Sequence, residues 1–165
     1  MKKILNPFEK CKEYNNFCSA AKNLKGLGLE FFVDGDNVVS TWSPTGDYTS
    51  YKSILHGGIQ SLLLDEIGCW VIFIFMETAG VTQSMSVNYL NPLYATKGDI
   101  KLEANLIEYV ENENIAKVHA RAFASSGVLC CEAFIDYFIY PKKLAKRFLQ
   151  YPDAVSDFFD IPLDF

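Results

Sequence analysis

The chain has 165 residues, of which 50% are hydrophobic and 21% are charged. This length suits a single domain with a sizeable core, spanning residues 1–165, and the composition excludes an intrinsically disordered protein. The formal net charge of -5 argues against a nucleic-acid-binding protein, which usually carries a basic surplus.

The cysteines and the N-terminus indicate a reducing compartment. The five cysteines are an odd number, and Cys130 and Cys131 are adjacent, which makes a poor disulfide framework. The N-terminus lacks the apolar segment of a signal peptide, and the apolar run 67–76 is shorter than the roughly 20 residues that span a bilayer. No second Cys or His pair follows at metal-ligand spacing. We therefore expect a cytoplasmic protein without a membrane partner or a metal.

The first elements of the chain are predicted as a helix and a β-hairpin. Residues 7–22 favour a helix, with Asn6 as its cap and Pro7 in its first turn. Residues 27–33 and 38–42 favour two strands, because Asp34-Gly35-Asp36-Asn37 between them has strong hairpin-turn chemistry. Residues 43–55 form a polar loop.

Residues 57–76 are predicted as one long buried helix. Apolar side chains recur at helical spacing, and little on any face is polar after Glu66. The members of this pattern are Leu62, Leu63, Ile67, Trp70, Val71, Ile74 and Phe75. A helix that is apolar nearly all round must be buried by other elements on every side. Gly80 ends it.

The second half of the chain is predicted as an antiparallel meander. Four segments with strand patterns, 81–90, 99–110, 115–124 and 128–140, alternate with short polar turns. In the first of them, the alternation puts Thr82 and Ser84 on one side and Val81 and Met85 on the other. A short helix and an aromatic segment follow Pro141. The element order predicts an α+β fold in which a curved sheet wraps one buried helix.

Asp65 is the first candidate for chemistry. It lies within the apolar sequence Leu62-Leu63-Leu64-Asp65, where a carboxylate is costly unless it meets water, a partner or a ligand. Desolvation raises the pKa of a carboxyl group, which is one way to prepare a general base. Periodicity alone leaves the alternative that Asp65 or Glu66 faces solvent at the edge of the helix.

His56-Gly57-Gly58 directly precedes this helix and is the second candidate. Two glycines at a helix start leave backbone N–H groups unobstructed, and the helix dipole adds positive potential there. Such a place can bind a carbonyl oxygen and stabilise the oxyanion that forms in acyl transfer. An ordinary glycine-rich helix entry would have the same sequence.

Three stretches carry a resemblance to a known family. The sequence His56-Gly57-Gly58-Ile59-Gln60-Ser61-Leu62-Leu63-Leu64-Asp65-Glu66 resembles the signature of PaaI-like (phenylacetate-pathway) thioesterases of the hotdog-fold 4-hydroxybenzoyl-CoA thioesterase superfamily. Two supporting stretches are residues 81–92, a strand that ends in an aromatic residue before Pro92, and Cys18 with Gly26-Leu27-Gly28-Leu29. The resemblance covers a core of about 18–140 and leaves 141–165 as a C-terminal extension.

The resemblance implies a hotdog fold and a set of catalytic roles. Asp65 would be the general base or nucleophile, and Gly57 and Gly58 would hold the carbonyl oxygen through a backbone N–H. His56 would orient this turn or contact the substrate. Thr82, contributed from the partner subunit, would position the water. Active sites of this family lie at a dimer interface, so the resemblance also implies a homodimer, often paired into a homotetramer.

The resemblance also implies the reaction and the surroundings of the substrate. The chain would hydrolyse a small, medium-chain or aryl acyl-CoA to the free acid and CoA, with no cofactor other than the CoA of the substrate. The residues expected to line the substrate site are Ser50, Gln60, Ser61, Glu66 and Ser84. Ser50 stands where many members carry an Asn or Gln, which removes an amide that positions the substrate.

Three other functions compete with hydrolysis. A hotdog dehydratase pairs a His with an acidic residue across the dimer, an arrangement that His56 and Asp65 do not copy. A non-catalytic acyl-CoA or lipid-binding module would keep the fold, and Ser50 favours it. A ligand-binding β-barrel is opposed by the long central helix. Four aromatic residues of the tail are candidates for lining an acyl or aryl pocket: Tyr151, Phe158, Phe159 and Phe165.

Overall fold

The computed structural model describes residues 1–160 of the chain, so Phe165 lies outside the described residues. One antiparallel sheet of seven strands dominates this part of the chain, in the order β1-β2-β3-β7-β8-β9-β6. Its strands are β1 (Lys2–Ile4), β2 (Phe31–Asp34), β3 (Asn37–Trp42), β6 (Gly80–Tyr89), β7 (Ile100–Val110), β8 (Ile115–Phe123) and β9 (Leu129–Ile139). A small hairpin of β4 (Thr49–Tyr51) and β5 (Ile54–Leu55) lies apart from it.

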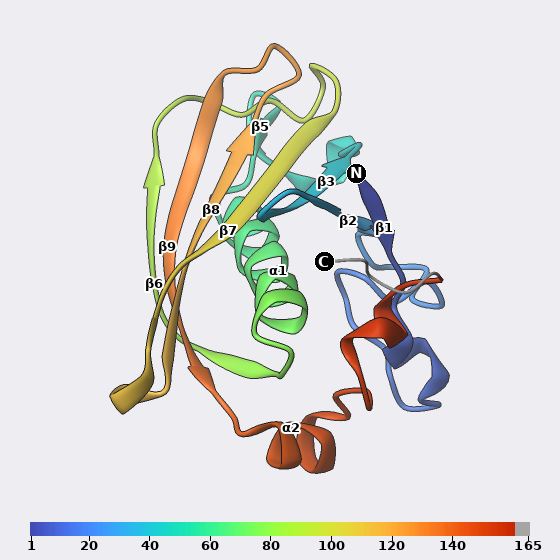
Figure 1. Ribbon diagram of the computed structural model, residues 1–165. Coiled ribbons are helices and arrows are strands. Elements are labelled where there is room, and N and C mark those ends of the chain that lie inside the picture. Colours follow the sequence, from blue (N-terminus) through green and yellow to red (C-terminus); the bar gives the residue numbers. More distant parts are fainter. Residues whose placement is uncertain (161–165) are drawn as a thin grey trace.

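The long helix α1 (Gly57–Phe75) lies in the curve of the sheet (Figure 1). This confirms the predicted buried helix and the hotdog fold. By length and composition α1 could also cross a membrane, and half of its most apolar 18-residue window is buried within the protein. Here β3, β6, β7, β8 and β9 all contact it, so the sheet covers one side of the helix.

Strand β8 explains how the sheet accommodates the helix. Ala116, Val118, Ala120 and Ala122 are buried, whereas the residues between them are partly exposed on the other face. The period of two is that of a strand with one covered face. Since three of these four side chains are alanines, α1 can approach the backbone of the sheet closely.

The first 30 residues differ from the prediction. The helix expected over 7–22 is wrong: only Pro7–Lys10 form a short 3-10 turn. Asn side chains bond the backbone instead, which competes with helix formation. Asn16 Oδ1 accepts the N–H groups of Cys18 (2.6 Å) and Ser19 (3.0 Å). Asn6 caps no helix and donates to the carbonyl of Ser19 (3.2 Å).

The predicted hairpin is confirmed, with a shorter first strand. Asp34 pairs with Asn37 across the turn, and Gly35 has a φ of 59°, which favours glycine. Residues 27–29 bond to the N-terminal segment rather than to the sheet, because the N–H of Leu27 donates to the carbonyl of Phe17 (2.9 Å). Strand β1, which the sequence pattern did not predict, pairs with β2 at the sheet edge.

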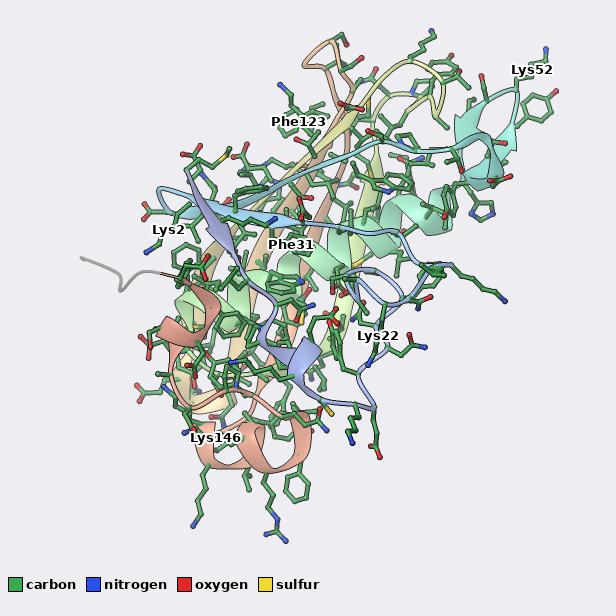
Figure 2. All side chains as sticks on the ribbon, turned by 90° about the vertical axis from the view of Figure 1, so that its right-hand side faces the viewer. Lys2, Lys22, Phe31, Lys52, Phe123 and Lys146 are labelled. Carbon is green, nitrogen blue, oxygen red and sulfur yellow. The ribbon has the colours of Figure 1, made fainter. Side chains whose placement is uncertain are left out.

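The two terminal segments meet on the side of α1 that the sheet leaves open (Figures 1 and 2). The predicted short helix of the tail is confirmed as α2 (Lys142–Leu149). The residues after α2 bond both the N-terminal segment and the helix α1. The carbonyl of Phe158 accepts the N–H of Leu5 (2.8 Å), and the hydroxyl of Tyr151 donates to the carbonyl of Phe73 (2.8 Å). Tyr151, Phe158 and Phe159 are buried in the core that results, so they hold the tail against the helix.

Candidate active site

The start of α1 is capped by its own histidine. His56 Nδ1 accepts the N–H of Gly58 (2.9 Å), which requires a neutral imidazole at that nitrogen. The N–H groups of Ile59 (2.9 Å) and Gln60 (3.1 Å) both donate to the carbonyl of His56. Among the described residues, the N–H of Gly57 is the one in this first turn that has no hydrogen-bond partner. The potential oxyanion donor is therefore Gly57 rather than Gly58.

Tyr89, at the end of β6, holds this first turn. Its hydroxyl contacts the carbonyl of Gly57 (3.0 Å) and the hydroxyl of Ser61 (2.7 Å), and Ser61 also reaches the Gly57 carbonyl (3.1 Å). Tyr89 and Ser61 each have one hydroxyl proton. One of the two hydroxyls therefore donates to the Gly57 carbonyl, and the other donates to the first hydroxyl. A Cβ at Gly57 would meet the Tyr89 hydroxyl at 3.4 Å, which leaves little room for a larger residue.

Asp65 receives two hydroxyl groups from the sheet. Thr82 of β6 donates to Asp65 Oδ1 (2.7 Å) within the same chain, so the expectation that the partner subunit contributes Thr82 to this carboxylate is wrong. Tyr137 of β9 donates to the main-chain carbonyl of Asp65 (2.7 Å) and lies 3.2 Å from Oδ1. Asp65 Oδ2 has no hydrogen-bond partner among residues 1–160. One oxygen is thus held in place, and the other is available to a water molecule or a substrate.

Tyr137 is a member of this site that the sequence pattern did not reveal. Burial raises the pKa of its hydroxyl well above the ordinary value, and the nearby thiol of Cys69 and carboxylate of Asp65 act in the same direction. It therefore remains a proton donor at neutral pH. A Cβ at Gly68 would lie 2.5 Å from the Tyr137 hydroxyl, so glycine is needed one turn beyond Asp65 for the tyrosine to approach.

Glu66 lies in a different environment. Its Oε1 accepts the hydroxyl of Ser19 (2.9 Å) and the indole N–H of Trp70 (3.0 Å). Ser19 in turn bonds the hydroxyl of Tyr14 (3.0 Å). Glu66 is therefore tied to the N-terminal segment, whereas Asp65 is tied to the sheet.

Ser84 lies on the opposite face of β6 from Thr82. Thr82 pairs with Tyr137, whereas Ser84 pairs with Asp136, and the register shifts between them. Such a bulge reverses which side chains face inward. The prediction of one side for Thr82 and Ser84 is therefore wrong, and Ser84 bonds Asp136 Oδ2 (3.1 Å) on the outer face.

Two further predicted substrate residues make local contacts. Gln60 is buried and donates to the carbonyl of Leu55 (2.8 Å), which joins α1 to β5. Ser50 lies in the β4–β5 hairpin, where its hydroxyl is 3.5 Å from the carbonyl of Ile54. The structure therefore brings Asp65 and Thr82 together in one cluster and His56, Gly57, Gly58 and Ser61 in another.

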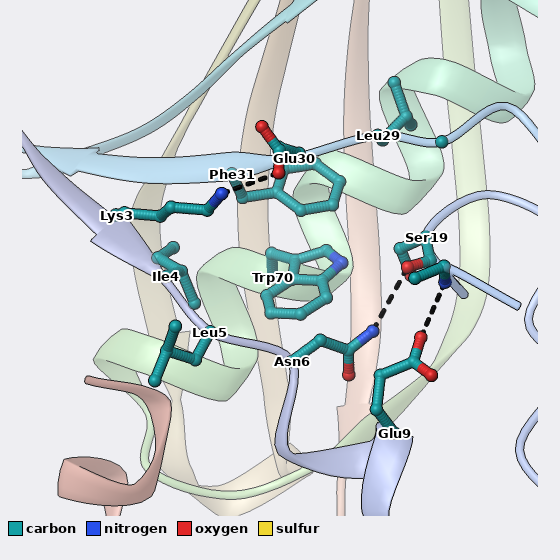
Figure 3. Close-up of a pocket in the computed structure, with 12 residues that line it drawn as sticks. Lys3, Ile4, Leu5, Asn6, Glu9, Ser19, Leu29, Glu30, Phe31 and Trp70 are labelled. Carbon is teal, nitrogen blue, oxygen red and sulfur yellow. Dashed lines mark hydrogen bonds and ion pairs between the residues drawn. The ribbon is translucent and has the colours of Figure 1, made fainter. Parts of the chain in front are cut away.

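A surface cavity of about 270 Å³ lies beside Trp70 of α1, between β1, β2 and the N-terminal segment (Figure 3). Lys3 and Glu30 form an ion pair across it (2.6 Å), and Trp70 lies at its base. Neither Asp65 nor Thr82 lines it. Within residues 1–160, no group of three or more His, Cys, Asp or Glu side chains is arranged to hold a metal ion.

Comparison with known proteins places the chain in a family. No family model matches the sequence. The chain is 30% identical over 128 residues to an uncharacterised protein of Schizosaccharomyces pombe, and the match covers 69% of this chain and 67% of that protein. The chain belongs to the same family as this yeast protein.

Solved structures of other proteins, some of them named as thioesterases, share this fold. A thioesterase superfamily protein has a TM-score of 0.67 at 18% identity, covering 74% of this chain and 59% of its own. A Streptococcus mutans protein bound to acetyl-CoA has a TM-score of 0.63 at 17% identity, covering 79% and 96%. A phenylacetic acid degradation-related protein of Ralstonia eutropha has a TM-score of 0.61 at 19% identity, covering 69% and 86%.

Proposed function

We propose that this chain is an acyl-CoA thioesterase that hydrolyses a small, medium-chain or aryl acyl-CoA to the free acid and CoA. The observation that carries the proposal is the geometry at Asp65. Thr82 and Tyr137 donate toward the residue, and one carboxylate oxygen remains free. The Streptococcus mutans neighbour, which is bound to acetyl-CoA, supports a CoA thioester as the ligand.

Asp65 has two possible roles that lead to the same products. As a general base, it takes a proton from water while the water oxygen attacks the thioester carbonyl carbon. The C–S bond then breaks, and the proton passes to the departing CoA thiolate. As a nucleophile, Asp65 attacks the carbonyl carbon, the C–S bond breaks, and CoA leaves as its thiolate while the acyl group stays on Asp65 as an anhydride. Water then hydrolyses the anhydride, which releases the acid, regenerates the Asp65 carboxylate and supplies the proton that the CoA thiolate takes up. Thr82 and Tyr137 fix the carboxylate in either case.

The oxyanion donor must come from a second chain in this proposal. Gly57 and Asp65 are eight residues apart on one helix, which is roughly 12 Å along its axis. A single thioester carbonyl cannot reach both groups. We infer that the N–H of Gly57 of the partner subunit faces Asp65 in a homodimer, which a second pairing could extend to a homotetramer.

Strand β6 supports such a dimer. It is an edge strand of ten residues with most side chains exposed, and exposed edges of this length normally pair or carry protecting charges. Val81, Tyr89 and the following Leu90 are exposed apolar residues along it. Pairing of two β6 strands around a two-fold axis would use the same surface twice.

One assay tests the activity. The purified protein is offered acyl-CoAs with short, long and aryl acyl groups, and a thiol reagent reports free CoA. We expect hydrolysis of at least one of them, a loss of at least about 100-fold in Asp65→Ala, and a smaller loss in Thr82→Ala. Full activity in Asp65→Ala would contradict the mechanism. Size-exclusion chromatography with light scattering tests the homodimer on the same sample.

A non-catalytic acyl-CoA-binding module is the second candidate. The observation that favours it is Ser50, whose hydroxyl makes one long contact within its own hairpin and supplies no amide N–H to a substrate. Binding of CoA thioesters without release of CoA from any acyl group would support this module. In the thioesterase, Ser50→Asn should keep or raise turnover, since it restores the amide.

A further inference from the structure

A second cavity opens beside α1, and its lining includes Glu66 but not Asp65. Its volume is about 190 Å³. It lies between α1, the start of β6, the N-terminal segment and the end of α2. Its lining residues are Phe8, Tyr14, Asn16, Glu66, Cys69, Phe73, Ala79, Gly80, Leu149 and Gln150.

Two residues that follow Asp65 along α1 line this cavity. Cys69 and Phe73 follow Asp65 at intervals of four residues, so the three side chains form one row along α1, with steps of roughly 6 Å. Strand β6 runs antiparallel to α1, because its end bonds the start of the helix through Tyr89 and Gly57 and its start bonds Asp65 through Thr82; the first residues of β6 therefore lie toward the cavity. Gly80 lies two residues before Thr82 on β6, which places both on the helix side of the strand. The cavity therefore begins about one helical turn beyond the carboxylate.

The terminal segments close the far end. Tyr151 donates to the carbonyl of Phe73 (2.8 Å), which holds the end of α2, including Leu149, at the level of Phe73. On the other side, the ring of Phe8 packs on that of Phe73 at 5.1 Å between centroids. Phe8 and Leu149 both lie outside residues 18–140, the part of the chain that resembles the thioesterase family.

The lining favours an uncharged apolar ligand. Burial raises the pKa of the Cys69 thiol well above its ordinary value, so the thiol is neutral at physiological pH. Glu66 supplies the one carboxylate of the lining, and its Oε1 is held by Ser19 and Trp70. A ligand that carries its own carboxylate into the cavity would be repelled by Glu66.

We propose that this cavity receives the acyl chain of the thioester, and that Phe8 and Leu149 set the greatest chain length that fits. The proposal rests on the proposed function, because it takes the thioester carbonyl to lie at Asp65. The ligand class is an unbranched, uncharged acyl chain of medium length. The terminal segments thereby act as the specificity-determining part of the site.

Binding of non-hydrolysable S-alkyl-CoA thioethers tests this inference independently of turnover. Calorimetric affinity should rise about fourfold for each added methylene until the cavity is full, and then stop rising. Cys69→Leu, one turn from Asp65, should stop the rise at a shorter chain than Leu149→Trp, which fills the far end. Leu149→Ala should move the limit to a longer chain. Phe148→Trp is the control, because Phe148 lies next to Leu149 on α2 but is 64% exposed.

Charge gives a second measurement on the same protein. A thioether whose chain ends in a carboxylate should bind at least about tenfold more weakly than its methyl-ended counterpart, and Glu66→Gln should reduce that difference. An unchanged length limit in Cys69→Leu, Leu149→Trp and Leu149→Ala would overturn the inference. Failure of the thioesterase proposal looks different: thioethers would bind with the expected length limits, but no acyl-CoA would be hydrolysed.

Discussion

Asp65 and Glu66 are neighbours in sequence, yet the fold gives them opposite surroundings. Asp65 meets Thr82 and Tyr137 from the sheet and keeps one oxygen free. Glu66 meets Ser19 and Trp70 and anchors the N-terminal segment. Successive residues of an α-helix point about 100° apart. A single residue of spacing therefore separates a carboxylate suited to chemistry from one that holds the structure together.

The difference also shows how a buried helix can carry charge. Neither carboxylate is fully enclosed, and each has hydrogen-bond donors, as a carboxylate in an apolar helix requires. The donors to Asp65 are hydroxyl groups of two adjacent strands, which are rigidly placed. The donors to Glu66 include a serine from a segment with little regular structure. Four predictions test this division of roles, from the largest expected effect to the smallest.

The largest difference should appear in catalysis. Asp65→Asn should lower kcat by at least about 100-fold, because an amide is neither a base nor a nucleophile. Glu66→Gln should leave kcat within about threefold for short acyl-CoAs, since it keeps an acceptor for Ser19 and Trp70. Steady-state hydrolysis by both variants gives the comparison. Equal losses would mean that the two carboxylates share one role.

Tyr137 should act as a positioning residue for Asp65. Tyr137→Phe removes the donor to the Asp65 carbonyl and should lower kcat by about tenfold with little change in KM. Gly68→Ala should have a similar effect, because its Cβ would displace the hydroxyl. An unchanged midpoint of urea denaturation beside the lower kcat distinguishes this role from loss of folding. A shift in KM alone would contradict this role.

The Glu66 contacts should matter for stability. Glu66→Ala leaves Ser19 and the Trp70 indole without an acceptor, which should lower the free energy of unfolding by about 2 kcal/mol. The control is Glu30→Ala, which breaks the exposed ion pair with Lys3 and should cost less than about 1 kcal/mol. Urea denaturation measures both. A larger loss of unfolding free energy in Glu30→Ala than in Glu66→Ala would contradict the role of Glu66 in holding the N-terminal segment.

The smallest effect concerns alkaline pH. The pKa of Tyr137 is raised above its ordinary 10.0 by burial, so the folded state keeps a proton that the unfolded state releases. Its contribution to stability is fully present below pH 10 and is lost as the pH rises beyond that value. Urea denaturation at pH 8 and 11 should show that the free energy of unfolding falls less with pH in Tyr137→Phe than in the natural chain. The fall in the free energy of unfolding between pH 8 and 11 should be only partly removed by this substitution, because burial also raises the pKa of Tyr14 and Tyr151.

The sequence by itself determined the central helix and the sheet around it. The apolar pattern over 57–76 and the alternation in 115–124 reflect burial against neighbours that are regular and repeated, so periodicity captures them. The Asp-Gly turn at 34–37 has local chemistry and needs no tertiary contact to be recognised. The spacing between Gly57 and Asp65 was likewise visible in the sequence.

Only the tertiary structure decided which residues meet Asp65. Tyr137 is 72 residues away in sequence, and the bulge after Thr82 that turns Ser84 outward has no clear sequence signal. The segment 7–22 fails to form a helix because its asparagines bond the backbone and its side chains pack on α1 and the tail. Its conformation is set by long-range contacts, which outweigh local helical preference. The divergence of Asp65 and Glu66 follows from the same cause, since the helix fixes their directions but the surrounding segments supply their partners.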